Sequence, residues 1–377
     1  MAKPILLVGA GFFGLTVARH IAENTDRHVV VIDARDHIGG NAWSEKDPET
    51  GIEIHKYGSH IFHTQHKWIW DYVNRFASFN KYRHTVFSRV ENQFVSMPVN
   101  LLTISQIYGE ALSPEAAIAR IRSDSEPAPA DASFEDLAIA KVGRPLYESL
   151  FRTYTMKQWQ TDPKDLPGEV FSRLPIRLTF ESRYFTDDYE GVPNDGYGSL
   201  FRNMADHPQI EVRLNTDFFD LKDFKSEYEF TVFTGPVDRY FDYRAGRLGW
   251  RTLDFVQETV DVEDYQGLAQ LNYPELKYEF TRIHEYRHFT PDFKPLVPKT
   301  IIAKEYSRFA GDNDLPYYPI ASSADREMLL KYRVLVESET DVYFGGRLGT
   351  YKYLDMHMAI GSAVSMFENT LMPRLSA

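Results

Sequence analysis

The stretch Ile5-Leu-Leu-Val-Gly9-Ala-Gly11-Phe-Phe-Gly14 runs from four apolar residues directly into the spacing G-x-G-x-x-G. A helical pattern follows, so the stretch predicts a buried strand, a glycine turn and a helix whose free N–H groups face an anion. Gly9 permits the tight turn, Gly11 lets a pyrophosphate approach the backbone, and Gly14 lets the helix pack on the strand. The stretch is therefore typical of a dinucleotide-binding domain.

A second predicted strand, 28–33, ends in Asp33, which stands 24 residues after Gly9 and is placed to bond a ribose hydroxyl. The alternative is a glycine turn in an ordinary βαβ unit, but strand, turn, helix, strand and acid follow in the expected order. Arg35 and the pair Gly39-Gly40 come next and resemble the second phosphate-binding segment of glutathione-reductase-like FAD proteins. This resemblance favours FAD over NAD as the cofactor.

Composition limits the other classes of function. A net charge of −12 argues against a general nucleic-acid surface, and the absence of cysteine excludes disulfides and thiolate chemistry. The apolar run at Ile5–Ala18 is too short and too rich in glycine for a signal or membrane segment, and none is evident later. A cytoplasmic protein without membrane insertion is the expectation.

The pattern along the chain predicts an α/β protein with three parts. The first is a discontinuous Rossmann-like FAD domain, formed by 1–81, about 195–225 and 335–377. About 82–170 reads as a helical insertion with proline starts at Pro114 and Pro145. About 171–194 and 226–334 read as an antiparallel β-sheet substrate domain, including a short strand at 178–180 and a mobile loop near 168–178.

Arginine and aromatic residues recur in short blocks through the second half of the chain. The blocks begin at Tyr154, Phe171, Leu248, Tyr278 and Gly346. Separated guanidinium forks and aromatic rings suit a nucleotide diphosphate, since the rings stack on a base and the forks clamp phosphate oxygens. Taken singly, each arginine could equally form a surface ion pair and each tyrosine a core contact.

Together these blocks resemble the bacterial UDP-galactopyranose mutases, from end to end of the chain except for 113–133. The shared motifs are Gly9-Ala-Gly-Phe-Phe-Gly14, His37-Ile-Gly-Gly-Asn41, Tyr57-Gly-Ser-His-Ile-Phe-His63, Tyr154-Thr-x-Lys-Gln-Trp159, Arg251-Thr-Leu-Asp-Phe255 and Gly346-Arg-Leu-Gly-Thr-Tyr-Lys-Tyr-Leu-Asp-Met356. The resemblance implies reversible isomerisation of UDP-galactopyranose and UDP-galactofuranose, with covalent catalysis from N5 of reduced FAD at the anomeric carbon. It also implies no net redox change, a reductant such as NAD(P)H, a product used in cell-surface glycans, and a homodimer.

The resemblance also assigns residues. The diphosphate clamps are Arg173 and Arg282, and the uridine-side and loop aromatics are Tyr154 and Trp159. The remaining substrate contacts are Tyr184, Arg251, Tyr318 and Tyr353, with Tyr317 as the substitute for Tyr318 if the alignment shifts by one. The cofactor contacts are Gly9, Gly11, Phe13, Gly14, Asp33, Arg35, Gly39, Gly40, Asn41, His60, Arg347, Leu354, Asp355 and Met356.

Two histidines complete the expected site. The resemblance places His60 beside the flavin and His63 toward the sugar, and both are expected to act in catalysis. His55 and His66 lie nearby in sequence, but the spacing is not a zinc motif, so no metal is expected.

Three alternatives remain at this point. An FAD-dependent amine oxidase or desaturase shares the N-terminal pattern but does not predict the arginine and tyrosine blocks. A flavin-free binding protein resembling the GDP-dissociation inhibitors would not need the intact glycines. A mutase that prefers UDP-N-acetylgalactosamine is the third, with His63 as a candidate for the residue that admits or excludes the N-acetyl group.

Overall fold

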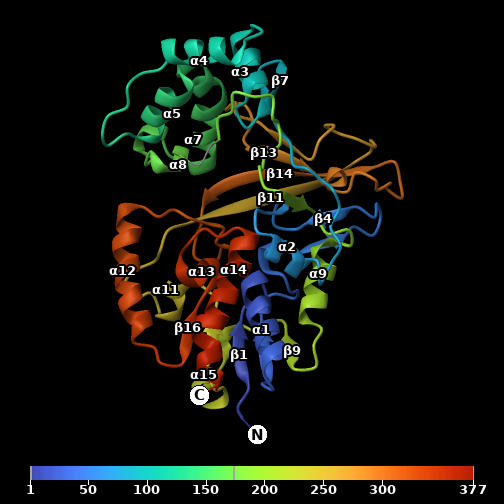
Figure 1. The fold of residues 1–377 in the computed structure, drawn as a ribbon, viewed down its shortest axis with the longest axis vertical. Helices are drawn as coiled ribbons and strands as arrows, with labels where there is room; N and C mark the ends of the chain where they lie inside the picture. The colour runs from blue at the N-terminus through green and yellow to red at the C-terminus, as the bar shows by residue number, and fades with distance from the viewer. Residues whose placement is uncertain (1, 173–174, 377) are drawn as a thin grey trace.

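The computed structural model describes residues 2–172 and 175–376. Figure 1 shows a lower part that holds both termini, long strands across the middle, and a cluster of helices at the top. The lower part is built on a parallel sheet and the middle on a mixed sheet. No helix in the described ranges is long and apolar enough to cross a membrane.

The parallel sheet has the strand order β16-β10-β1-β2-β9. Its strands are β1 (Ile5–Val8), β2 (Val29–Ile32), β9 (Ile210–Arg213), β10 (Thr231–Phe233) and β16 (Val342–Phe344). β1 and β2 are buried at every residue, as parallel strands covered on both faces require. One face packs on α1 (Phe12–Asn24), α9 (Gly196–Ala205) and α14 (Met356–Met366). The other packs on aromatic residues between 218 and 240.

β10 changes one predicted boundary. The substrate domain was expected to resume at about 226, yet β10 lies in the centre of the parallel sheet, between β1 and β16. The physical reason is that Thr231, Val232 and Phe233 are all buried, which suits a central parallel strand. The other lower-part helices are α10 (Phe224–Glu227), α11 (Val237–Tyr240), α12 (Ser323–Glu337), α13 (Gly346–Thr350) and α15 (Met372–Ser376).

The mixed sheet has the order β15-β11-β14-β13-β12-β6-β7. Its strands are β6 (Val86–Val90), β7 (Gln93–Met97), β11 (Trp250–Val260), β12 (Gln270–Asn272), β13 (Arg282–Glu285), β14 (Thr300–Phe309) and β15 (Tyr318–Pro319). β11 and β14 form a long antiparallel ladder from Arg251↔Phe309 to Val260↔Thr300. β14 buries Ala303, Glu305 and Ser307 on one face, and that face supports the site described below.

The hairpin of β6 and β7 corrects the expected helical insertion at 82–170. Val86, Ser88 and Val90 are buried alternately with half-buried residues, which is the period of a strand. The helical part therefore starts at Leu101. It contains α3 (Leu101–Tyr108), α4 (Pro114–Ser123), α5 (Phe134–Val142), α6 (Arg144–Leu146), α7 (Thr153–Trp159) and α8 (Glu169–Ser172).

Local capping explains several helix starts. Ser113 caps α4 directly before Pro114, and Pro145 stands in the first turn of α6, so both predicted proline starts are confirmed. Residues 178–180, expected to be a strand, form a bend. Two small sheets, β3 (Ser44–Lys46) with β4 (Glu53–His55) and β5 (Phe62–Thr64) with β8 (Tyr189–Gly191), join the lower part to the middle, next to α2 (Lys67–Val73).

Candidate functional site

The glycine turn after β1 has the geometry that its sequence predicts. Gly9 has a φ of +102°, and a Cβ there would lie 2.0 Å from Thr234 Oγ1. A Cβ on Gly14 would lie 2.0 Å from Gly9 O, so helix and turn touch at this position. At Gly11 the nearest atom to a Cβ is Gly40 Cα at 3.9 Å. Gly11 thus faces open space beside the second glycine segment, where a phosphate can approach both backbones.

Asp33 and Arg35 stand at the carboxyl end of β2. The Asp33 carboxylate accepts hydrogen bonds from Ala10 N at 2.9 Å and Arg35 N at 3.0 Å, which holds the two phosphate-facing segments together. Arg35 Nη2 donates to Asn41 Oδ1 at 2.7 Å, and its guanidinium lies 4.5 Å from the centre of the Tyr57 ring. Arg35 Nη1 is buried without a hydrogen-bond partner in the structure, which leaves a cationic donor for a ligand.

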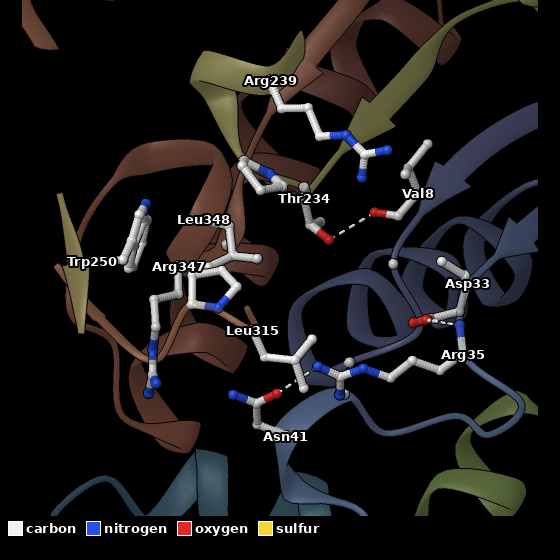
Figure 2. Close-up of a pocket in the computed structure, with 18 of the residues that line it drawn as sticks. Val8, Asp33, Arg35, Asn41, Thr234, Arg239, Trp250, Leu315, Arg347 and Leu348 are labelled. Carbon is white, nitrogen blue, oxygen red and sulfur yellow. Dashed lines mark hydrogen bonds between the residues drawn. The ribbon is translucent and has the colours of Figure 1, made fainter. Parts of the chain in front are cut away.

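These groups line a cavity of about 1080 Å³, large for a ligand pocket. Figure 2 shows the Val8–Thr234 and Arg35–Asn41 hydrogen bonds on its wall, with Leu315 between Arg35 and Arg347. Predicted cofactor contacts that line it are Gly9, Gly11, Phe13, Gly14, Asp33, Arg35, Gly39, Gly40, Asn41, His60, Arg347, Leu354, Asp355 and Met356. The glycine cradle, the free Arg35 donor and the volume of the cavity fit a dinucleotide cofactor.

The C-terminal segment closes the cavity from the side of β16. A Cβ on Gly345 would lie 2.1 Å from the Phe13 ring, so this turn packs directly on α1. Arg347 donates to Leu354 O at 2.6 Å and to Tyr317 O at 3.1 Å, and its guanidinium lies 4.9 Å from the Tyr353 ring. Arg347 therefore fixes the loop that carries Leu354, Asp355 and Met356 into the cavity.

His60 lies on the loop that meets the other wall of the cavity. Its Nδ1 is 2.6 Å from Gly58 O, and because a carbonyl only accepts, Nδ1 carries the proton and Nε2 is the acceptor. Burial lowers the pKa of His60 to about 4, so the ring is neutral at neutral pH. The His60 backbone N–H donates to His55 Nδ1 at 3.0 Å, and this hydrogen bond attaches the His60 loop to the end of β4.

His63 belongs to a separate group of rings. Its Nδ1 is 2.8 Å from Asp187 Oδ2, and its ring stacks on Phe185 with 3.7 Å between centres. Polar atoms of His63, Asp355 and His357 lie within 4.8 Å of one another, so His63 stands beside the loop that enters the cavity. Phe185 and Asp187 were not selected from the sequence, although both stand in the block after Tyr184.

Among residues 2–172 and 175–376, two groups of side chains have the spacing of metal ligands. Besides His63, Asp355 and His357, the second group is Asp264, Glu285 and His288. The Glu285 oxygens accept hydrogen bonds from Tyr265 N, Gln266 N and Thr300 Oγ1. These bonds satisfy the buried Glu285 carboxylate with donors from the protein itself.

Arg282 is the centre of the second half of the site. Its Nε lies 3.2 Å from Glu305 Oε1, and its Nη2 donates to the Tyr154 hydroxyl at 2.6 Å. Glu305 Oε2 is 2.9 Å from His284 Nε2, and His284 Nδ1 is 2.6 Å from Ser59 Oγ, next to His60. Burial is the largest single effect and disfavours the Arg282 charge, but Glu305 and the surrounding tyrosines together outweigh it and raise the pKa of Arg282 above its usual range.

Three further predicted tyrosines surround the arginines. The Arg282 and Arg347 charges both act on the Tyr318 hydroxyl, and the Tyr318 ring lies 5.8 Å from the Tyr353 ring. Tyr184 is near enough to Arg282 to act on its charge, and its side chain is exposed like that of Tyr353. Tyr317, the substitute for Tyr318, is buried in the wall instead. Tyr318 is thus close to both Arg282 and Arg347, and Arg347 lines the cofactor cavity.

Arg251 and Trp159 occupy different positions from the tyrosines. Arg251 is 1% exposed, and its guanidinium donates to Gln158 O at 3.0 Å, Ser307 Oγ at 3.0 Å and Gln160 Oε1 at 3.2 Å. In this structure Arg251 therefore holds the end of α7 on β14, and its expected contact with substrate stays a prediction. Trp159 is half-buried at the end of α7 and packs against the core of the helical part.

One predicted site residue cannot be compared with the structure, and two residues of the site were not predicted. Arg173, the other expected diphosphate clamp, lies outside the described residues. Glu305 and His284 were missed from the sequence, but a signal existed: Glu305 follows Ile301 and Ala303 at the period of a strand, which places a carboxylate on a buried face. A buried acid requires a partner, and an arginine or histidine on a neighbouring strand is the obvious one.

Comparison with known proteins gives a consistent result. A family model described as UDP-galactopyranose mutase matches residues 149–353, and one described as NAD(P)-binding Rossmann-like domain matches 7–76. The chain is 40% identical over 370 residues to a probable UDP-galactopyranose mutase of Klebsiella pneumoniae, covering 98% of this chain and 95% of that protein. It is 39% identical over 367 residues to a dTDP-fucopyranose mutase of Escherichia coli, covering 96% of each.

A solved structure supports the fold. The structure described as reduced UDP-galactopyranose mutase superposes with a TM-score of 0.76 and 17% identity, covering 99% of this chain and 96% of that one. At this identity the likeness concerns the fold alone.

Proposed function

The chain belongs to the UDP-galactopyranose mutase family, and we propose that it interconverts UDP-galactopyranose and UDP-galactofuranose with FAD in its reduced form. The observation that carries the proposal is the adjacency of two sites. His60 and Arg347 line the cavity. Ser59, the neighbour of His60, is joined through His284 and Glu305 to the partly buried Arg282–Tyr154 contact, and both Arg282 and Arg347 act on Tyr318. A nucleotide sugar bound at Arg282 would thus present its sugar to the cofactor.

The cofactor would be held by the chain at both of its ends. Backbone N–H groups at Gly11 and Gly40 and the free Arg35 donor would bind the pyrophosphate. The loop at 354–356 and His60 would border the redox-active ring. When bound, a reduced flavin supplies a nucleophilic nitrogen toward the anomeric carbon of the sugar.

The part of the reaction assigned to the protein is to stabilise charge on the departing diphosphate. Arg282 is partly buried, charged and held by Glu305, so it needs little reorganisation as negative charge develops. Hydroxyls of Tyr154, Tyr184 and Tyr318 add neutral donors around it. Arg173 stays the predicted second clamp. An interaction that strengthens as the bond to UDP breaks lowers the barrier as well as improving binding.

His60 has a separate role in this proposal. Its ring is neutral, and Nε2 is an acceptor because Nδ1 donates to Gly58 O. An uncharged acceptor beside the cofactor can take a hydrogen bond without adding positive charge to the cavity. His63, held by Asp187, is proposed to face the sugar.

A different nucleotide sugar is the second candidate for the substrate. The similarity to a dTDP-fucopyranose mutase is 39%, against 40% for the probable UDP-galactopyranose mutase. A dTDP-fucose lacks the ribose 2′-hydroxyl and the sugar 6-hydroxyl and carries a methyl group on the base. Reversible ring contraction of dTDP-fucopyranose is therefore the alternative substrate pair for the same site.

The test is direct. Purified flavin-containing protein is incubated with UDP-galactofuranose or with dTDP-fucofuranose, with and without dithionite, and the products are separated by chromatography. We expect UDP-galactopyranose to form only after reduction. Conversion of the dTDP sugar alone selects the second candidate, and no conversion of either sugar by reduced protein contradicts both. The homodimer, the cytoplasmic location, NAD(P)H as reductant and the use of the product in glycans stay predictions.

A further inference from the structure

Lys157 is the charged residue of the Tyr154–Trp159 motif to which no role was assigned. Its ammonium lies within a ring of four backbone carbonyls. Nζ donates to Phe280 O at 2.8 Å, to Tyr278 O at 3.0 Å and to Glu275 O at 3.1 Å, and it also contacts Tyr273 O. An ammonium has three donors, so this ring uses all of them.

The Lys157 charge is held without an acidic partner. Among residues 2–172 and 175–376, no carboxylate forms an ion pair with Lys157, and the nearby Glu275 carboxylate pairs with Lys277 at 2.8 Å. Burial lowers the pKa of Lys157 to about 8, which leaves it protonated at neutral pH. Backbone carbonyls therefore accept all the hydrogen bonds of this ammonium, and its removal would leave several of them without a donor.

The position of the ring relates Lys157 to the site. Lys157 lies one turn after Tyr154 on α7, and the carbonyls at 273–280 lead directly into Arg282 on β13. The Tyr154–Arg282 hydrogen bond joins the same two segments at 2.6 Å. Lys157 and this hydrogen bond are thus two attachments between α7 and the continuous segment 273–282.

We propose that Lys157 is a positioning residue that ties α7 to the segment 273–280 and thereby sets the contact between Tyr154 and Arg282 for a substrate diphosphate. This inference rests on the proposed function, because it takes the ligand of Arg282 to be the diphosphate of UDP. It adds a residue that does not contact the substrate itself.

A double-mutant cycle tests the proposal. UDP binding to flavin-loaded protein is measured by isothermal titration for wild type, Lys157→Met, Tyr154→Phe and the double variant. We expect each single variant to bind UDP about tenfold more weakly, and the double variant to be no more than about twofold weaker than the weaker single variant. Lys331→Met, an exposed lysine on α12, is the matched control and is expected to bind like wild type.

Two results would overturn the proposal: Lys157→Met binding UDP within about twofold of wild type, or the effects of Lys157→Met and Tyr154→Phe multiplying as those of independent residues do. A purely structural lysine would give the second result. Wild-type protein that holds flavin but does not bind UDP would instead contradict the proposed function, and the inference would fall with it.

A second variant covers the case in which Lys157→Met does not fold. Lys157→Arg keeps the charge and the donors, but its planar fork cannot reproduce a compact ammonium among four carbonyls. We expect it to fold and to bind UDP more weakly than wild type, again without multiplying the effect of Tyr154→Phe. Wild-type affinity in Lys157→Arg, or a multiplied effect, would overturn the proposal on this second route.

Discussion

Arg282 Nη2 and the Tyr154 hydroxyl form a 2.6 Å hydrogen bond between residues 128 positions apart, joining the mixed sheet to the helical part. The same guanidinium lies 3.2 Å from Glu305 Oε1, so one side of Arg282 is held by a buried carboxylate and the other by a phenol. A phenol is a weaker partner than a carboxylate, and a diphosphate can compete for that side. Arg282 is therefore both fixed in position and open to an anion.

Loss of Arg282 should mainly slow the reaction. We expect Arg282→Ala to lower kcat by about 10²–10³-fold, because a preformed donor to the developing charge is removed. The control is Arg333→Ala, on the exposed face of α12. Steady-state kinetics of the reduced enzyme give the result. A raised KM with unchanged kcat would show that Arg282 acts equally on bound substrate and transition state, contrary to the proposal.

Glu305 should matter for stability. It is 3% exposed, and although burial would raise its pKa, Arg282 and His284 keep that pKa below its usual range. Glu305→Gln removes the charge and leaves the partly buried Arg282 cation without its counter-ion. We expect the free energy of unfolding to fall by about 3 kcal/mol.

Urea unfolding at neutral pH measures this change in free energy. The matched control is Glu327→Gln on α12, where the carboxylate is exposed. An equal and small loss in both variants would mean that Glu305 does not hold Arg282.

The lower part of the molecule could be predicted well because its signals are local. Gly9, Gly11, Gly14 and Asp33 follow a spacing that one βαβ unit imposes, and the structure places them on one cavity. The C-terminal return to that cavity through Arg347 was also predicted. What failed was the assignment of β10, since three buried residues carry too little pattern to separate two sheets.

The site beyond the cofactor was harder to predict, because its partners are distant in sequence. Arg282 was predicted from resemblance, but Glu305 and Ser59 reach the same network from other strands and loops. Arg251 shows the converse case. An arginine in a motif indicates a ligand contact, yet strand pairing places this one inside, against Gln158 and Ser307.

A substitution at Gly11 should affect cofactor binding without affecting the stability of the fold. Its φ of −82° suits any residue, and a Cβ would meet nothing closer than Gly40 Cα at 3.9 Å. We therefore expect Gly11→Ala to keep its thermal stability without cofactor but to lose most bound flavin, because the methyl group enters the space for the pyrophosphate. The flavin-to-protein absorbance ratio and a melting curve of flavin-free protein measure the two effects.

Gly14→Ala is the contrasting variant. Its Cβ would lie 2.0 Å from Gly9 O, so helix and strand would have to separate. We expect a lower melting temperature in the flavin-free protein as well as less flavin. Normal flavin content in Gly11→Ala would argue that the pyrophosphate does not lie against this turn.

His84 gives a pH-dependent prediction. The ring is 3% exposed and bonded to the Tyr82 hydroxyl at 2.9 Å, and burial lowers its pKa from 6.5 to about 3. Between these pH values the unfolded chain binds a proton at His84 that the folded chain does not. Stability contributed by the neutral ring is therefore present above pH 6.5 and is lost as the pH falls, by about 1.4 kcal/mol per pH unit.

His84→Asn removes the titrating group while keeping a polar side chain beside Tyr82. We expect its free energy of unfolding to fall less steeply than that of wild type between about pH 6 and pH 4, by about 1 kcal/mol per pH unit. Urea unfolding of both proteins across this range provides the slopes. Parallel slopes for His84→Asn and wild type would mean that His84 can be protonated in the folded protein, and that water reaches this side of the site.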